Sequence, residues 1–137
     1  MPPEQLISLS KMRLENAKKL LVTSKMLIDV EDCKSSANRS YYAIFNAMRA
    51  CLALHSIDYK RHSGVISDFR RLFIKSGKLE IELSDIITAL FEMRNKSDYN
   101  DFYVVSKADV IAQLDNAKHF ISKIELLLGE AWITGNI

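Results

Sequence analysis

The sequence predicts an all-α fold, an up-and-down bundle of about five helices that forms a single domain over residues 1–137. Hydrophobic residues make up 48% of the chain and recur at the spacing of amphipathic helices. The chain has only four glycines and two prolines, and both prolines precede residue 4. A β-sandwich or barrel needs a turn roughly every 8–12 residues, so this composition argues against one. The apolar content and a net charge of +2 also exclude a disordered chain.

The first two helices are predicted at residues 8–28 and between 32–36 and about His55. The first ends where the polar stretch 29–32 interrupts its apolar stripe. The second is apolar around so much of its circumference that it must lie at the centre of the bundle or pack on two sides. The residues of its wide apolar face are Ala37, Tyr41, Tyr42, Ile44, Phe45, Met48, Cys51 and Leu52.

The third helix is predicted at residues 63–76 and the fourth at residues 80–97. Gly77 follows the third at the position where a left-handed residue commonly ends a helix. The segment 98–105 is expected to be a loop rich in aromatic residues.

The fifth helix is predicted to begin at Ser106 and to run to Gly129. Ser106 and Asp109, three residues on, resemble a capping box with Asp in place of Glu. The residues after Gly129 are expected to fray.

Cysteine usage and the N-terminus predict a cytoplasmic protein. Cys33 and Cys51 are too far apart for a metal knuckle, so we expect two thiols and neither a metal nor another cofactor. The N-terminus is polar and lacks the apolar region of a signal peptide. No apolar run approaches the ~18 residues of a membrane span, so no membrane association is expected.

A second stripe of the helix at 32–55 carries Ala43, Ala50 and Ala53, with Arg39 and Asn46 between them. One interpretation is a solvent-facing strip that contains alanines. The other is a close seam across a symmetric homodimer, formed with the fourth helix. The second interpretation predicts that Ala43→Arg or Ala50→Arg yields a monomer.

Charge is distributed unevenly along the chain. Residues 60–78 hold six basic residues and one acidic residue, whereas residues 79–103 hold six acidic and two basic residues. If the basic segment lies beside the aromatic loop in the fold, the two together are of the kind that binds RNA phosphates and stacks bases. Alternatively, the two segments pair with each other or are solvated, and the pI of about 8.5 is low for a dedicated nucleic-acid binder.

The three histidines are expected to be structural. His55 and His62 flank the turn 56–61, where a histidine commonly contacts the last carbonyls of one helix or caps the next. His119 lies alone in the fifth helix, which favours a surface position over a ligand role.

Arg94 is the most informative residue of the fourth helix. It lies four residues beyond Leu90 and seven beyond Ile87, so a permanent cation interrupts an apolar stripe. A buried guanidinium is costly unless it is paired. Either Asp98, one turn on, forms an intrahelical pair with Arg94, or the helix end opens to a cleft where Arg94 binds an anion such as phosphate.

Three segments together resemble the HEPN domain family: SSANRSYYAIFNA (35–47), HSGVI (62–66) and RNKSDY (94–99). They are similar in particular to its small stand-alone prokaryotic branch. The resemblance implies a helical bundle that is usually a dimer and often works with a minimal nucleotidyltransferase, as in toxin–antitoxin modules. Many members of that family are metal-independent ribonucleases whose active cleft straddles the dimer axis.

The chain departs from the nuclease signature of that family, an Arg followed by a polar residue with a His four to six residues further on. Arg94 and Asn95 match its beginning, but Tyr99, Asn100 and Asp101 stand where the His is expected. Histidine is the side chain best suited to proton transfer near neutral pH. The proton-transfer residue is therefore absent or replaced.

Three functions remain open. The chain is a HEPN module that binds nucleotide or RNA in a dimer cleft and acts with a nucleotidyltransferase, an active ribonuclease toxin, or a helical interaction protein with a structural Arg94. The sequence favours the first. The candidate catalytic residues are Arg94 and Asp98, and the candidate ligand-binding residues are Arg39, Asn46, Arg94, Asn95 and Tyr99.

Overall fold

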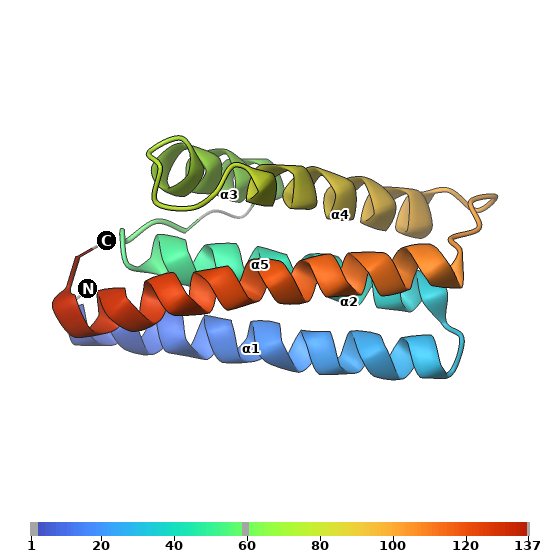
Figure 1. Ribbon diagram of the computed structural model, residues 1–137, viewed down its shortest axis with the longest axis horizontal. Helices are drawn as coiled ribbons and strands as arrows, with labels where there is room; N and C mark the ends of the chain where they lie inside the picture. The colour runs from blue at the N-terminus through green and yellow to red at the C-terminus, as the bar shows by residue number, and fades with distance from the viewer. Residues whose placement is uncertain (1–2, 59–60, 137) are drawn as a thin grey trace.

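The computed structural model describes residues 3–58 and 61–136, and every regular element within them is helical. Figure 1 shows α1, α2 and α5 running along the long axis of the molecule, with α3 and α4 stacked on one side of them. The prediction of an all-α, up-and-down bundle is confirmed. In chain order the elements are α1 (Pro3–Asp29), α2 (Cys33–Ala53), α3 (His62–Phe69), η1 (Arg70–Ile74), α4 (Glu82–Tyr99) and α5 (Lys107–Thr134).

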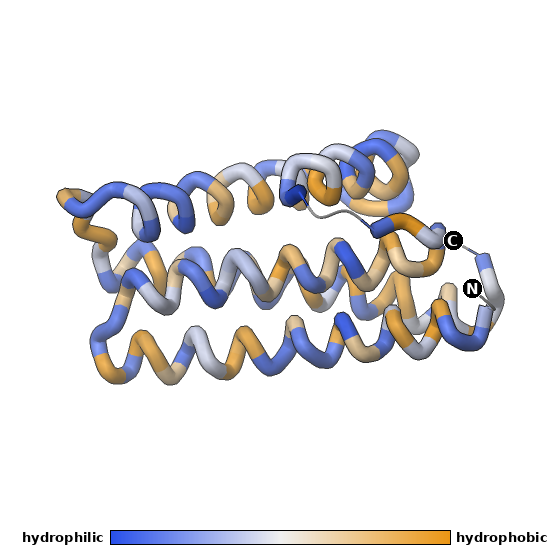
Figure 2. Tube along the Cα trace, turned by 180° about the vertical axis from the view of Figure 1, so that it is seen from behind, coloured by the Kyte–Doolittle hydropathy of each residue, from blue (hydrophilic) through white to orange (hydrophobic). Residues whose placement is uncertain are grey.

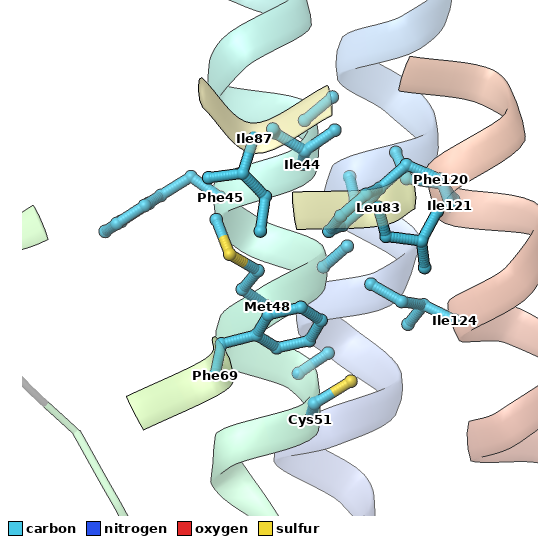
Figure 3. Packing of buried hydrophobic residues seen from close by; sticks show 14 of the residues in the cluster. Ile44, Phe45, Met48, Cys51, Phe69, Leu83, Ile87, Phe120, Ile121 and Ile124 are labelled. Atoms are coloured by element: carbon cyan, nitrogen blue, oxygen red, sulfur yellow. The ribbon is translucent and has the colours of Figure 1, made fainter. Parts of the chain in front are cut away.

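The second helix, α2, forms the centre of the bundle, as its wide apolar face predicts. It packs against α1, α3, α4 and α5. Hydrophobic and hydrophilic residues are interleaved along the helices (Figure 2), and the buried hydrophobic residues of the five α-helices form one main cluster. Figure 3 shows side chains of four helices meeting in this core: Ile44, Phe45, Met48 and Cys51 of α2, Phe69 of α3, Leu83 and Ile87 of α4, and Phe120, Ile121 and Ile124 of α5.

The alanine stripe of α2 is covered by the chain itself. Ala43 and Ala50 are fully buried in the single chain, and Ala53 is 2% exposed. The Ser10 hydroxyl of α1 donates a hydrogen bond of 2.8 Å to the Ala50 carbonyl oxygen. The solvent-facing interpretation is therefore wrong, and so is the assignment of the seam to a dimer interface with the fourth helix. The close seam itself is present, but it lies within one chain. The small side chains allow α1 of the same chain to approach closely.

Two helices start at side-chain caps, of which the sequence analysis identified the one at Ser106. The Asp32 carboxylate accepts a hydrogen bond of 3.2 Å from the backbone N–H of Ser35, so α2 begins at Cys33. The Ser106 hydroxyl accepts one of 3.0 Å from the backbone N–H of Asp109. Both satisfy a backbone donor that the first helical turn leaves unpaired.

The C-terminal helix extends beyond its predicted end. α5 continues through Gly129 to Thr134 and stops before Gly135, which has a φ of 75°. The Trp132 indole N–H donates a hydrogen bond of 3.0 Å to the Ser10 hydroxyl oxygen, and Ala131 is buried. The prediction of fraying after residue 129 is wrong, because these tertiary contacts hold the last turns against α1.

Neither cysteine is part of a disulfide in the described residues. Burial raises the pKa of the Cys51 thiol, which keeps that side chain protonated and unreactive. Within residues 3–58 and 61–136, no helix combines the length and the apolar character that crossing a bilayer requires.

Candidate functional site

Arg94, in the last turns of α4, is held by four hydrogen bonds. Its Nε donates to Asp98 Oδ2 at 2.9 Å and its Nη1 to Asn95 Oδ1 at 3.2 Å. Its Nη2 donates to Tyr42 Oη at 2.9 Å and to Tyr99 Oη at 3.2 Å. A guanidinium carries five N–H groups, so one remains without a partner among the described residues.

Three tyrosine rings surround this guanidinium. The Arg94 Cζ atom lies 5.2 Å from the ring centroids of Tyr42 and Tyr99 and 5.5 Å from that of Tyr41. These are cation–π distances, and they place the positive charge on aromatic faces. Tyr99 is 74% exposed, so one side of this group faces solvent. We refer to Arg94, Tyr41, Tyr42, Asp98 and Tyr99 as the Arg94 cluster.

The pairing of Arg94 with Asp98 matches the intrahelical interpretation of the sequence. The pair is not sealed, however, since a quarter of the Asp98 side chain is exposed. A solvated carboxylate can give up part of its contact when another anion arrives. The geometry is therefore compatible with a structural pair and with an anion site that Asp98 occupies when no ligand is bound.

The α2 helix brings a second cation to the edge of the cluster. Asn38 Nδ2 donates to Asp98 Oδ2 at 2.9 Å, and Arg39 Nη1 donates to Asn38 Oδ1 at 2.7 Å. Arg39 thus reaches the cluster through Asn38. The structure does not bring Asn46 to the cluster: its Nδ2 donates to the Tyr42 carbonyl oxygen in its own helix at 2.8 Å.

His62 contacts the cluster from the start of α3. Its Nδ1 forms a hydrogen bond of 2.9 Å with the buried Tyr41 hydroxyl, and its ring centroid lies 5.5 Å from that of Tyr42 and 4.2 Å from that of Phe45. The N-cap of α3 is Arg61, with no side-chain cap, so the expected capping role of His62 is wrong. Burial, and then the charge of Arg94, lower the pKa of His62 below its ordinary value.

Tyr41, Tyr42 and His62 are site residues that the sequence analysis missed. The sequence analysis assigned both tyrosines to the apolar face of the second helix. His62 lies 32 residues before Arg94, so helical spacing could not relate His62 or the tyrosines to α4. The one indication of a role in the site was that all three residues belong to the segments that resemble the HEPN family. Tyr41 keeps its proton, because burial raises the pKa of its hydroxyl.

A groove of about 550 Å³ between α3 and α4 adjoins the cluster at Phe91. Phe91 lines the groove, and its ring centroid lies 5.8 Å from that of Tyr41. Arg70 also lines it and donates hydrogen bonds of 2.7–3.0 Å to the Ser84 hydroxyl, the Ser84 carbonyl and the Thr88 hydroxyl. All these partners are neutral, and no carboxylate within the described residues pairs with Arg70. The other lining residues are Ser63, Ile66, Ser67, Ile87, Thr88 and Glu92.

Comparison with known proteins gives matches over most of the chain. The family model of the HEPN domain matches residues 10–127. A UPF0332 protein of Thermotoga maritima is 33% identical over 112 residues, which cover 82% of this chain and 85% of the relative. Two relatives come from Methanocaldococcus jannaschii. The one named "Putative toxin MJ0142" is 30% identical over 84% of this chain and 78% of its own length. The one named "Putative toxin MJ0605" is 31% identical over 85% of this chain and 87% of its own length.

Proposed function

Since the chain belongs to the HEPN domain family, we propose that it is the toxin-type member of a toxin–antitoxin module and that it binds nucleotide or RNA phosphates through Arg94. Names given to two relatives, each at least 30% identical, support the toxin assignment. The observation that carries the binding proposal is the position of Arg94, a cation held among three tyrosine rings at an open helix end.

The Arg94 cluster combines the two interactions on which binding of single-stranded nucleic acid depends. Arg94 supplies the charge and the fork geometry that suit a phosphate. The exposed ring of Tyr99 offers a face on which a base stacks, a contact worth about 1–3 kcal/mol per base. Arg39 adds a second positive charge beside Asn38.

The neighbouring groove extends this binding surface in the direction that a bound RNA strand would follow. Arg70 brings a cation whose partners are all neutral hydroxyl or carbonyl oxygens, and Phe91 supplies an apolar wall next to the cluster. In the proposal, the nucleotide next to the one at Arg94 lies here, with its phosphate toward Arg70. The acidic side chain of Glu92, which also lines the groove, limits how many phosphates this surface accepts.

The binding proposal is tested with a short, fluorescently labelled single-stranded oligoribonucleotide. Arg94→Gln should weaken the affinity about 5- to 150-fold, because a charge-assisted contact contributes ~1–3 kcal/mol. Lys25→Gln removes one positive charge from a surface pair on α1 and serves as the matched control, with a change of less than about twofold. Equal affinity of wild type and Arg94→Gln would refute the proposal.

We further propose that the chain forms a homodimer and acts with a minimal nucleotidyltransferase. Because the alanine stripe is covered by α1, the dimer must use another surface. Three large apolar side chains are exposed at and after the end of α4: Tyr99, Phe102 and Val104, at 74%, 95% and 87%. Phe102→Asp should convert a dimer to a monomer in sedimentation. A monomeric wild type would contradict the homodimer. The partner is tested by co-expression with a nucleotidyltransferase from an adjacent reading frame, and failure of the two proteins to co-purify would contradict that part of the proposal.

A further inference from the structure

We infer that a pocket between the first half of α1 and the turn after α2 binds a small organic carboxylate, a molecule that joins one negative charge to a short apolar group. The pocket has a volume of about 300 Å³ and shares no lining residue with the Arg94 cluster. Its ligand is independent of the RNA that we propose to bind at Arg94.

The turn after α2 fixes one wall of the pocket. Ser56 has a φ of 57°, and its backbone N–H donates a hydrogen bond of 3.0 Å to the Ala53 carbonyl oxygen. The backbone N–H of Ile57 donates one of 3.1 Å to the Leu52 carbonyl oxygen. These two bonds form a Schellman motif, which ends a helix in a defined geometry. The motif places Asp58 directly after the turn, where its carboxylate contacts α1.

Two arginines share the carboxylate of Asp58. Arg13 Nη2 donates to Asp58 Oδ2 at 3.2 Å, and Arg49 Nη2 donates to Asp58 Oδ1 at 3.1 Å. Within the described residues, neither arginine forms an ion pair with another carboxylate. Two positive charges therefore face one negative charge, and the Asp58 side chain is itself 57% exposed to solvent. One positive charge remains unbalanced.

Arg13 is the arginine that lines the pocket. Its side chain is only 8% exposed, and its one other hydrogen bond runs from Nη1 to the Arg49 carbonyl oxygen at 3.2 Å. Three of its five N–H groups thus have no partner among the described residues. A buried guanidinium is costly unless it is paired and fully hydrogen-bonded. Burial, and then the charge of Arg49, lower the pKa of Arg13, and the attraction of Asp58 does not offset them. A second anion in the pocket would supply the missing partner.

The charge of the pocket favours a carboxylate over a phosphate. The excess charge is one, and the two oxygens of a carboxylate fit a guanidinium through parallel hydrogen bonds. A phosphate monoester carries a charge of about −1.5 to −2, and Asp58 would repel the additional negative charge.

The walls of the pocket add an apolar requirement. Four of its seven lining residues are apolar, and a bare anion would leave them in contact with water. A water molecule occupies about 30 Å³ of the liquid, so the pocket has room for a ligand of about ten non-hydrogen atoms. The apolar lining residues are Leu6, Leu9, Ala53 and Ile57.

The probe is phenylacetate, a carboxylate of about this size, titrated into the ¹⁵N-labelled full chain at fixed pH and ionic strength. We expect saturable shifts of the backbone amide signals of Ser56, Ile57 and Asp58, with a dissociation constant between about 0.1 and 10 mM. Phenylacetamide, which has the same size and no charge, should bind at least about tenfold more weakly. Inorganic phosphate should cause no saturable shift of these signals.

Two variants test the position of the carboxylate. Arg13→Gln should weaken phenylacetate binding about 10- to 150-fold, because it removes a charge-assisted contact. Since Arg13 is buried and this variant could fail to fold, Leu6→Trp fills the apolar part of the pocket from the start of α1 and leaves Arg13 in place. It should weaken binding at least about tenfold. Lys25→Gln, which removes a surface charge farther along α1, is the matched control and should bind as wild type does.

Each contrary result overturns a defined part of the inference. Equal affinity for phenylacetate and phenylacetamide would exclude recognition of the charge. Wild-type affinity in folded Arg13→Gln or in Leu6→Trp, or shifts confined to residues outside the pocket, would show that the carboxylate lies elsewhere. Phosphate that binds as tightly as phenylacetate would overturn the assignment of an apolar carboxylate, and the absence of any saturable shift would overturn the site. None of these results affects RNA binding at Arg94, which the oligonucleotide assay tests separately.

Discussion

Asp98→Asn should tighten RNA binding even though it removes a partner of Arg94. Asp98 accepts hydrogen bonds from Arg94 Nε and Asn38 Nδ2, and asparagine retains the size and one acceptor oxygen of the side chain. In the proposed site, Asp98 neutralises Arg94 when no ligand is present and repels a phosphate that binds to the remaining N–H of Arg94. The substitution removes that repulsion and leaves the guanidinium in place.

The magnitude follows from the distance between the two anions. A phosphate on the free N–H of Arg94 lies about 6 Å from the Asp98 carboxylate, and with an effective dielectric constant of ~40 their repulsion is about 1.4 kcal/mol. Salt reduces this value, so the expected gain in affinity is about 3- to 10-fold. The Arg94 side chain is 11% exposed and that of Asp98 25%, so the pair lies between the exposed and the buried case, and its loss should lower the free energy of unfolding by about 1–2 kcal/mol.

The assay is fluorescence anisotropy with labelled single-stranded RNA at fixed ionic strength, combined with urea denaturation of each variant. Asp101→Asn is the matched control, since it removes a carboxylate three residues further on, in the loop after α4, and Asp101 makes no contact to Arg94 in the described structure. Unchanged or weaker binding in Asp98→Asn, with wild-type stability, would refute the proposed competition. A loss of more than about 3 kcal/mol in stability would show that the pair is structural.

Three further outcomes test the packing of the bundle. Burial is the main cause that lowers the pKa of both His55 and His62. The stability that these neutral imidazoles contribute should therefore be present above about pH 6.5 and decline as the pH falls below that value. Equal urea midpoints at about pH 7.5 and pH 5 would contradict this expectation. Ser24 is fully buried and hydrogen-bonded to two serine hydroxyls of α2, so Ser24→Ala should cost about 1–3 kcal/mol in denaturant unfolding, and a change below about 0.5 kcal/mol would speak against that network. Ala50→Arg should prevent folding rather than yield a folded monomer, and a native circular dichroism spectrum of that variant would prove the α1–α2 packing wrong.

Contacts within one helix were predictable from the sequence. Helical spacing places Asp98 one turn from Arg94, and local chemistry identifies Ser106 as a cap. The wide apolar face of α2 predicts its central position, because such a face needs covering on several sides. These inferences use only residues that are close in the chain.

Contacts between helices were not predictable in this way. Tyr42 and Arg94 are 52 residues apart, and Ser10 and Trp132 are 122 apart, so their hydrogen bonds depend on which helices become neighbours. The same holds for the alanine stripe, which indicates close packing without identifying the partner helix. His62 is a further example, because its position at a turn predicts a helix cap, whereas the fold places it beside Tyr41.

The most direct test of RNA binding at Arg94 is an NMR titration of ¹⁵N-labelled protein with single-stranded RNA. The side-chain Nε–H signal of Arg94 is assigned by its absence from the Arg94→Gln spectrum, and its hydrogen bond to Asp98 protects it from exchange. We expect this signal to shift with RNA concentration and to reach saturation at the same midpoint as binding measured by anisotropy. RNA that binds while the Arg94 signal stays in place would show that the ligand lies elsewhere and contradict the proposed site.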